Sequence, residues 1–277
     1  MTTVVTGATG RVGSRFVPRL LSQGHAVRIL ARDAERAEPL RARGAEVVLG
    51  DLHEAGTLAA ALRDVTAVVH LAASFRGVTP EEAMAVNQAA TVELARSALE
   101  HGVQRFVLAS TNLVYGPGRG RPAREDDEPA PTMAYPQGKA AAEAALRELD
   151  GLDLRVVRFA FVYGEGDPHL AESLMWARDW AAHKRLHMVH HADVGQGIIR
   201  ALLAGGVAGE TFNIADDAPV TAAELLELNG ETLAPDAAYR PLDDPWEGIV
   251  DTSKSRTVLG FRPIYPTVYA ARDAGAI

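Results

Sequence analysis

The feature that most constrains this chain is a glycine-rich turn near its start, TGATGRVG at residues 6–13. The turn follows a β-branched run and opens an amphipathic segment that ends at Gly24. Glycines at positions 7, 10 and 13 allow a sharp turn and close approach of the backbone to a pyrophosphate, whose charge free helix N-terminal amides favour. The strand–turn–helix context therefore predicts a dinucleotide-binding turn rather than an ordinary glycine-rich connection.

Short β-branched runs alternate with longer amphipathic stretches along the first two thirds of the chain. The expected strands are residues 2–6, 26–31, 46–49, 67–71, 105–109 and 154–162, and the clearest helices are about 10–24, 80–101 and 136–149. This rhythm predicts parallel strands joined by crossover helices. Apolar residues at consecutive strand positions indicate helices on both sheet faces. We therefore expect an α/β fold with a Rossmann, doubly wound parallel sheet.

The pattern weakens after residue 164, which suggests two unequal parts. We assign residues 1–164, with about 191–215, to an NAD(P)-binding Rossmann domain. Residues of about 165–190 and 216–277 should form a small C-terminal, substrate-binding part over the carboxyl ends of the strands, where such sheets bind ligands. The stretch from Gly116 to Pro131 is rich in Pro, Gly and charge and predicts a long surface loop, whose acidic run at 125–128 should be solvated.

Charge and composition narrow the possible partners. A formal net charge of −8 gives no electrostatic reason to bind nucleic acid or an anionic membrane. The chain has no cysteine, so disulfides and thiolate sites are excluded. No leader pattern or apolar stretch of about 18 residues is present. We expect a soluble, cytoplasmic protein acting on a small molecule.

The end of the second expected strand bears on cofactor choice. An acidic residue there hydrogen-bonds the adenosine ribose of NAD, whereas an arginine meets the 2′-phosphate of NADP. Arg32 and then Asp33 follow this strand. We favour NADP(H) over NAD(H), with a solvated Arg32 as the alternative. Asp51 and Leu52 are placed beside the adenine, although Asp51 also suits a helix N-cap.

The order of several further motifs resembles the extended short-chain dehydrogenase/reductase family, also called the NAD-dependent epimerase/dehydratase family. These motifs are TGATGRVG, GDL at 50–52, HLAA at 70–73, Asn87, STNLVYG at 110–116, Tyr135 with Lys139, VRFAFVYGEGD at 157–167, HHADV at 190–194 and DTSKSRTVLGF at 251–261. The resemblance covers nearly the whole chain.

The resemblance implies that Tyr135 and Lys139 carry the proton chemistry and that Thr111 orients the reacting oxygen, with Ser110 as a substitute. Lys139 lies one helical turn after Tyr135, so both can face one cleft. A nearby ammonium and the nicotinamide charge favour phenolate and thus lower the pKa of the tyrosine. Thr111 would stabilise charge on the same oxygen that Tyr135 protonates.

The motifs and the resemblance together give two sets of contacts. The expected cofactor contacts are Gly7, Thr9, Gly10, Arg11, Val12, Gly13, Arg32, Asp51, Leu52, Leu71, Ala72, Ala73, Asn87, Ser110, Tyr135, Lys139, Phe159, Phe161 and Val162. The candidate substrate contacts are Ser74, Phe75, Asn112, Phe161, Tyr163 and Trp176, of which the aromatic residues also suit a core. No metal site is expected, since the histidines lack ordered ligand spacing. We interpret His70 as a hydrogen-bonded strand-end residue and Asp193 as a structural anchor.

Three reactions remain open within this resemblance: a ketone reductase or alcohol dehydrogenase, a nucleotide-sugar epimerase that retains NAD, and a non-catalytic NADP-binding sensor. Members acting on nucleotide sugars commonly have asparagine where Phe161 stands and proline at Phe159. Dehydratases need an acidic pair after the threonine, where Asn112 and Leu113 stand. These departures favour a reductase of a weakly charged carbonyl substrate. A homodimer is a further expectation that the resemblance allows.

Overall fold

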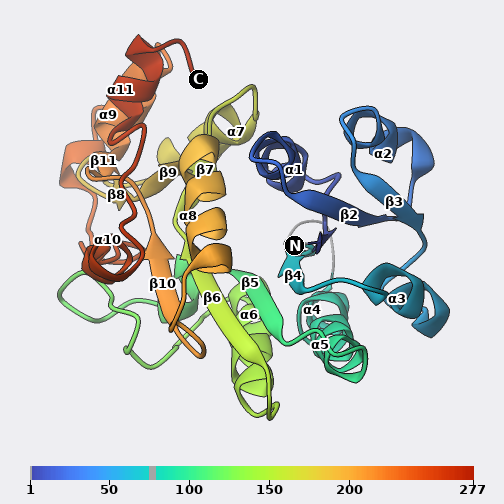
Figure 1. Cartoon of the computed structure of the whole chain (residues 1–277). Helices are drawn as coiled ribbons and strands as arrows, with labels where there is room; N and C mark the ends of the chain where they lie inside the picture. Colours follow the sequence, from blue (N-terminus) through green and yellow to red (C-terminus); the bar gives the residue numbers. More distant parts are fainter. Residues whose placement is uncertain (1, 75–78) are drawn as a thin grey trace.

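The computed structural model describes residues 2–74 and 79–277. Its centre is a seven-stranded sheet with strand order β10-β6-β5-β4-β1-β2-β3 (Figure 1). The strands are β1 (Thr2–Thr6), β2 (Ala26–Ala31), β3 (Glu46–Leu49), β4 (Ala67–His70), β5 (Arg105–Thr111), β6 (Asp153–Phe159) and β10 (Thr211–Ile214). Every neighbouring pair is parallel. The doubly wound α/β fold is confirmed.

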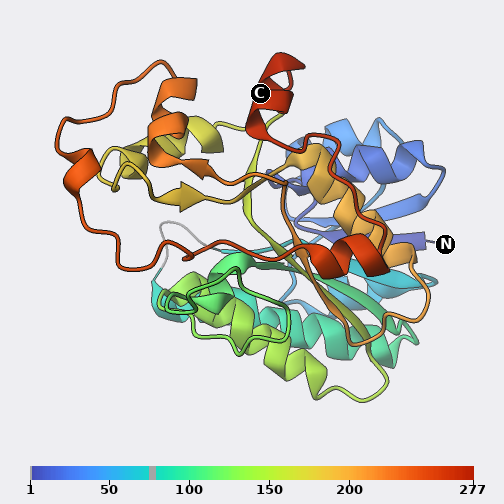
Figure 2. The ribbon, with the colours of Figure 1, turned by 90° about the vertical axis from the view of Figure 1, so that its left-hand side faces the viewer.

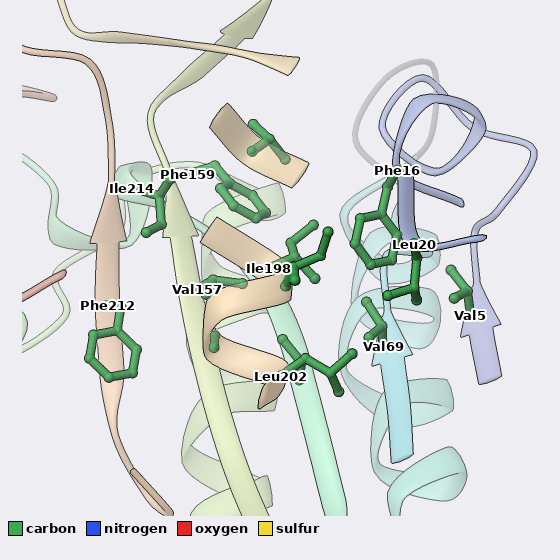
Figure 3. Close-up of a cluster of buried hydrophobic side chains, with 14 of the residues drawn as sticks. Val5, Phe16, Leu20, Val69, Val157, Phe159, Ile198, Leu202, Phe212 and Ile214 are labelled. Carbon is green, nitrogen blue, oxygen red and sulfur yellow. The ribbon is translucent and has the colours of Figure 1, made fainter. Parts of the chain in front are cut away.

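Helices cover both faces of this sheet, as the consecutive apolar residues predicted. One face packs on α1 (Gly13–Ser22), α2 (Ala34–Arg41) and α8 (His191–Leu203). The other packs on α3 (Ala55–Leu62), α5 (Ala90–Glu100) and α6 (Ala134–Arg147). In β4, Val69 joins a cluster with Phe16 of α1 and Ile198 of α8 (Figure 3), whereas Val68 joins Leu58 on the opposite face. Successive strand residues thus serve two separate cores.

Two expected elements are interrupted. The helix expected over residues 80–101 consists of α4 (Pro80–Met84), a π-helical turn η1 (Ala85–Ala89) and α5. The strand expected over 154–162 divides, because the Ala160 N–H still bonds to Ile214 O whereas the Phe161 N–H bonds to His187 O. The chain therefore leaves the central sheet and forms β7 (Phe161–Tyr163), which pairs with β9 (Met188–His190).

Helix α10 (Ser253–Val258) lies beside β10 of the central sheet. The other remaining elements form a smaller part with its own core. They are α7 (His169–Ala177), β8 (Arg185–Leu186), β11 (Val220–Thr221), α9 (Ala222–Leu228), η3 (Ala237–Tyr239) and α11 (Val268–Asp273). Tyr163, Leu174, Leu225 and Val268 are buried together there. Figure 2 shows α9 and α11 set apart from the central sheet, on the side of the C-terminus.

Asp193 anchors the C-terminal segment to α8, as its position in the sequence suggested. Its carboxylate accepts the backbone N–H groups of Ile264 at 2.5 Å and Tyr265 at 3.1 Å. The loop that begins at Gly116 joins this segment through a bridge between Ala123 and Val250. No helix within the described residues is long and apolar enough to cross a membrane.

Candidate active site

The predicted nucleotide residues lie at one edge of the sheet. Gly7, Arg32 and Leu71 directly follow β1, β2 and β4, and Thr111 ends β5. Because these strands are parallel, their carboxyl ends lie at the same edge. The chain passes from β1 to β2 on one side, while β4 lies on the other side of β1. The ends of β1 and β4 therefore mark the point where doubly wound sheets bind ligands.

The glycine-rich turn is packed so tightly that side chains are excluded. At Gly7, whose φ is +68°, a Cβ atom would lie 2.4 Å from the Ala72 nitrogen. At Gly13, a Cβ atom would lie 2.2 Å from the Gly7 oxygen. The turn closes with a 3.0 Å hydrogen bond from the Gly10 N–H to that oxygen. With no acidic residue in the first turn of α1, this backbone cradle fits a pyrophosphate.

The adenosine end of the candidate site carries two arginines. Arg32 is 82% exposed, and its Nη1 lies 3.8 Å from Asp51 Oδ2. Asp33 is the N-cap of α2, since its Oδ1 accepts the N–H groups of Glu35 and Arg36 at 2.9 and 3.1 Å. The Asp33 carboxylate is thus engaged by its own helix.

Arg36 is a candidate that the sequence reasoning missed. Its Nη2 donates to the carbonyl oxygen of Thr9 in the glycine-rich turn, at 3.1 Å. The available signal was spacing, since Arg36 follows Arg32 by four residues across the start of a helix. Arg32 thus follows the end of β2 and Arg36 lies in α2, and these two elements border the turn.

The expected catalytic residues come from β5 and α6. Thr111 is buried at the end of β5, where its Oγ1 accepts the Leu113 N–H at 3.3 Å. Lys139 is 1% exposed, and burial lowers the pKa of its ammonium to about 8, while the charge of Glu143 opposes this shift. Lys139 therefore loses its charge at a lower pH than an exposed lysine does.

The phenol of Tyr135 is a weak acid. Burial raises its pKa to about 12. The side chain is half-buried in the first turn of α6. A protonated phenol of this kind is a proton donor, and a further positive charge is needed before it serves as a base.

Ser110 is engaged in a buried polar network. Its hydroxyl donates to Glu143 Oε1 at 2.5 Å, and Arg158 forms two hydrogen bonds with the same carboxylate at 3.1 and 2.6 Å. All three side chains are buried. The network therefore engages the Ser110 hydroxyl proton, whereas the expected candidate at the end of β5, Thr111, is outside it.

The expectation that the acidic run at 125–128 is solvated is wrong for Glu125. Glu125 is half-buried, and its carboxylate accepts the Asn213 N–H at 2.8 Å. Burial raises the pKa of this carboxyl group. Asn213 in turn accepts the Tyr115 hydroxyl at 2.7 Å. This part of the acidic run is thus structural and not simply solvated.

The structure gives Asn87 and Asn112 specific backbone partners. Asn87, in the π-helical turn, accepts the Ser74 N–H at 2.9 Å and donates to the Ser74 oxygen at 2.6 Å. It thereby fixes the segment that follows β4. Asn112 donates to the Gly248 oxygen at 2.6 Å. Phe75, another expected contact, lies outside the described residues.

The aromatic candidates occupy different environments. Phe161 is half-buried and stacks on His169 with ring centres 4.0 Å apart. Tyr163 is fully buried, and its hydroxyl has no hydrogen-bond partner within the described part of the chain. Trp176 is partly exposed on α7. Phe159 is buried beside the core of the sheet. Of these, Phe161 and Trp176 are accessible to a ligand.

The remaining cofactor candidates lie in several different places. Leu71 and Ala72 lie against Gly7, Ala73 is exposed, and Leu52 packs on the core beneath β3. Val12 packs on the opposite core, and the Val162 oxygen contacts His169 Nδ1 at 3.0 Å. The Arg11 side chain extends from the turn to α7.

His70 is the hydrogen-bonded strand-end residue that the sequence suggested. Its Nδ1 lies 2.6 Å from Thr6 Oγ1 and its Nε2 lies 2.8 Å from Thr91 Oγ1. Burial lowers the pKa of His70 to about 3. No group of three His, Asp or Glu side chains suited to a metal occurs among residues 2–74 and 79–277.

Comparisons with known proteins agree with this geometry. The model of the NAD dependent epimerase/dehydratase family matches residues 3–215. A ketoreductase of Stigmatella aurantiaca, named for 4-hydroxy-2-methyl-3-oxo-4-farnesyl-3,4-dihydroquinoline-1-oxide, is 31% identical over 84% of this chain and 73% of its own. A UDP-glucose 4-epimerase of Mycolicibacterium smegmatis is 33% identical over 95% of this chain and 94% of its own.

A solved structure extends the similarity to the whole fold. The short-chain dehydrogenase/reductase superfamily protein from Agrobacterium tumefaciens, determined with bound NAD, is 25% identical to this chain. Its TM-score is 0.79, with 99% of this chain and 96% of the other covered. Relatives of this chain thus include a reductase, an epimerase and an NAD-binding protein.

Proposed function

This chain belongs to the NAD dependent epimerase/dehydratase family, and on that basis we propose that it is an NAD(P)-dependent ketone reductase. It transfers a hydride between nicotinamide and a small, weakly charged carbonyl or alcohol substrate. The observation that carries this proposal is that the two residues directly after Thr111 are uncharged. Asn112 beside it is engaged with Gly248, and the next residue, Leu113, is 38% exposed.

Apolar side chains flank both oxygen-directed residues. Leu113 lies two positions after Thr111, and Met133, which is 53% exposed, lies two positions before Tyr135. Phe161, stacked on His169, has no amide or cationic group with which to hold a diphosphate. Apolar side chains next to the reacting groups suit an apolar ketone better than a nucleotide sugar. The farnesylated compound in the name of the Stigmatella relative supports this substrate class.

Tyr135 supplies the proton in the direction of ketone reduction. When bound, the nicotinamide cofactor supplies the hydride and a positive charge in its oxidised form. The phenol of Tyr135 gives its proton to the carbonyl oxygen, which becomes the alcohol hydroxyl, and solvent reprotonates the phenolate. Thr111 donates a hydrogen bond to the same oxygen, and Lys139 holds the ribose hydroxyls and stabilises the phenolate.

NADP(H) is the proposed cofactor, in preference to NAD(H). Arg32 and Arg36 border the turn with two guanidinium groups, which favour a 2′-phosphate through charge-assisted hydrogen bonds. Asp33, the acidic residue available to a ribose hydroxyl, is already hydrogen-bonded as the N-cap of α2. The turn itself accommodates the pyrophosphate of either dinucleotide.

A nucleotide-sugar epimerase is the second candidate, favoured by the similarity to the Mycolicibacterium epimerase over 95% of this chain. In that reaction the cofactor is reduced and reoxidised without leaving. Release and identification of nucleotide from the purified protein, followed by titration of the stripped protein with NADPH and NADH, separates the candidates. A reductase should be purified without tightly held nucleotide and should bind NADPH reversibly. Retained NAD would favour the epimerase, and failure to bind either dinucleotide would contradict both.

A further inference from the structure

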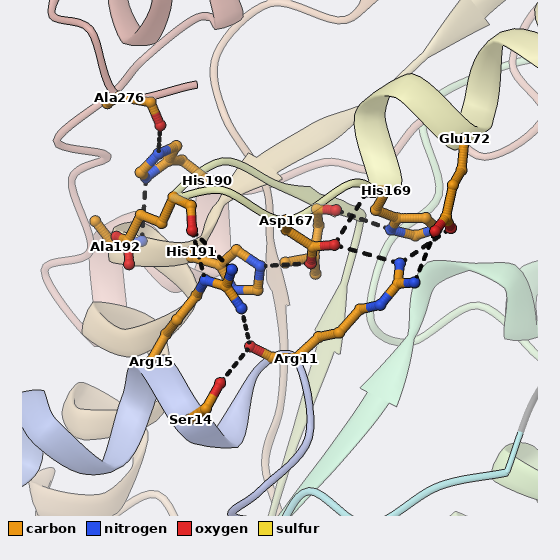
Figure 4. Close-up of polar contacts among 12 residues, drawn as sticks. Arg11, Ser14, Arg15, Asp167, His169, Glu172, His190, His191, Ala192 and Ala276 are labelled. Carbon is orange, nitrogen blue, oxygen red and sulfur yellow. Dashed lines mark hydrogen bonds and ion pairs between the residues drawn. The ribbon is translucent and has the colours of Figure 1, made fainter. Parts of the chain in front are cut away.

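Arg11 joins the glycine-rich turn to the smaller part of the molecule. Its guanidinium group donates to both carboxylate oxygens of Glu172, at 3.1 and 2.8 Å, and lies 3.2 Å from Asp167 Oδ1 (Figure 4). Glu172 is in the first turn of α7, and Asp167 lies just before that helix. One side chain of the turn thus contacts two carboxylates, one just before α7 and one in its first turn.

Asp167 needs Arg11 as a counter-charge because the Asp167 side chain is only 1% exposed. Its other oxygen, Oδ2, accepts a hydrogen bond from His191 Nε2 at 2.8 Å. Burial lowers the pKa of His191 to about 4, so that imidazole is neutral at pH 7. Arg11 is therefore the charged partner of Asp167 among the described residues. Without it, a buried carboxylate would lose its counter-charge, which is strongly destabilising.

The same carboxylate fixes the beginning of α7. Asp167 Oδ1 accepts the backbone N–H of His169 at 3.0 Å, and the His169 ring stacks on Phe161. Trp176 lies near the other end of this helix. Two candidate substrate contacts, Phe161 and Trp176, are consequently tied to the position of α7. Arg11 reaches Phe161 through Asp167 and His169, and Trp176 through helix α7 itself.

We propose that Arg11 is a positioning residue that couples dinucleotide binding at the glycine-rich turn to the placement of α7 on the substrate side. This inference rests on the proposed dinucleotide site but not on the reaction catalysed there. Coupling of two sites is reciprocal. Dinucleotide binding should stabilise α7, and disruption of the Arg11–Asp167 pair should weaken dinucleotide binding.

The test is amide hydrogen exchange of the whole protein, free and saturated with NADPH or NADH, whichever binds more tightly. In the natural protein, the dinucleotide should slow exchange in both α1 and α7. In Arg11→Gln, α1 should remain protected and α7 should lose most of its response. Arg19→Gln is the matched control, since Arg19 lies on α1, the helix that follows the turn, and pairs with Glu165 in the loop before α7. It should keep both responses.

Each alternative result contradicts a defined part of the inference. Full protection of α7 in Arg11→Gln, or protection of α1 without α7 in the natural protein, would overturn the coupling. No protection of either helix would contradict the dinucleotide site itself. These outcomes distinguish the coupling from the proposed function because no turnover is measured.

Asp167→Asn provides a second variant if Arg11→Gln folds poorly. It removes the carboxylate charge at a distance from the turn and should weaken dinucleotide binding roughly 5- to 20-fold. An unchanged dissociation constant would contradict the proposal. The double variant Arg11→Gln/Asp167→Asn should melt at a higher temperature than Arg11→Gln, since it buries no unpaired charge. A melting temperature equal to or below that of Arg11→Gln would show that Arg11 does not neutralise Asp167.

Discussion

Ser110 donates a 2.5 Å hydrogen bond to Glu143, a buried carboxylate that lies one helical turn after Lys139. Arg158 forms an ion pair with the same carboxylate at 2.6 Å. This network joins the end of β5, where Ser110 precedes Thr111, to helix α6 and strand β6. A buried, charged network therefore links β5 and α6, the two elements that carry the candidate catalytic residues.

Glu143→Gln should destabilise the protein by about 3–5 kcal/mol, because it leaves the buried guanidinium of Arg158 without its counter-charge. Chemical denaturation measures this free energy. Glu210→Gln breaks the exposed ion pair with Lys254 and should cost about 1 kcal/mol or less. Equal losses of unfolding free energy in the two variants would mean that the buried ion pair of Glu143 contributes no more to stability than the exposed pair of Glu210.

Tyr135→Phe should reduce turnover by about 10²- to 10⁴-fold while leaving dinucleotide affinity almost unchanged, since only the proton donor is removed. Steady-state rates and a fluorescence titration with NADPH give the two quantities. Tyr239→Phe, at an exposed tyrosine of the smaller part, is the control and should behave as the natural protein. Normal turnover in Tyr135→Phe would remove Tyr135 from the mechanism.

Gly7→Ala should weaken dinucleotide binding more than tenfold, a loss above about 1.4 kcal/mol. The new Cβ would meet the backbone at Leu71 and Ala72, and the residue would hold a positive φ. Gly24→Ala is the matched control, because Gly24 also has a positive φ, +81°, but no atom lies within 4 Å of its Cβ position. It should cost roughly 1 kcal/mol in stability and leave binding intact. Similar binding in both variants would argue against the tight packing of the turn.

Arg32→Gln and Arg36→Gln should each weaken NADPH binding about tenfold and NADH binding little, since a charge-assisted hydrogen bond contributes about 1.5–3 kcal/mol. Parallel titrations with the two dinucleotides measure the preference. Arg41→Gln changes an exposed arginine at the end of the same helix and should alter neither affinity. Equal losses for NADPH and NADH would mean that these arginines do not read the 2′-phosphate.

The pH dependence of stability should contain a term from His70. Its pKa is about 3 in the folded protein and about 6.5 when unfolded, so the unfolded chain binds one more proton between these values. Stability is therefore lost as pH falls from 6.5 toward 3, at up to about 1.4 kcal/mol per pH unit. In His70→Gln this slope should be shallower by that amount, whereas exposed His53→Gln should leave it unchanged. Denaturation at several pH values decides between these results.

The sequence predicted the features that depend on local patterns. The glycine-rich turn, the ends of β1 and β2 and the glycine after α1 follow from steric demands on a few neighbouring residues. The double-sided burial of β4 was also readable, because Val68 and Val69 are both apolar. The family resemblance then supplied the candidate roles of Thr111, Tyr135 and Lys139.

The features that the sequence did not predict depend on contacts between distant residues. The strand expected through Val162 ends earlier because Phe161 finds a partner in His187 rather than in β10. Arg36 reaches Thr9, and Asn112 reaches Gly248, across 27 and 136 positions. None of these follows from composition or periodicity.

Transfer of deuterium from NADPH labelled at C4 of the nicotinamide to an apolar ketone tests the central claim most directly. The protein would be incubated with each of the two stereospecifically labelled cofactors and a set of uncharged ketones, with Tyr135→Phe as the control. The account predicts deuterium on the carbinol carbon of a product alcohol, from one labelled face only, together with an equal amount of free NADP⁺. Absence of label from every ketone, with epimerisation of a nucleotide sugar by NAD that never leaves the protein, would contradict it.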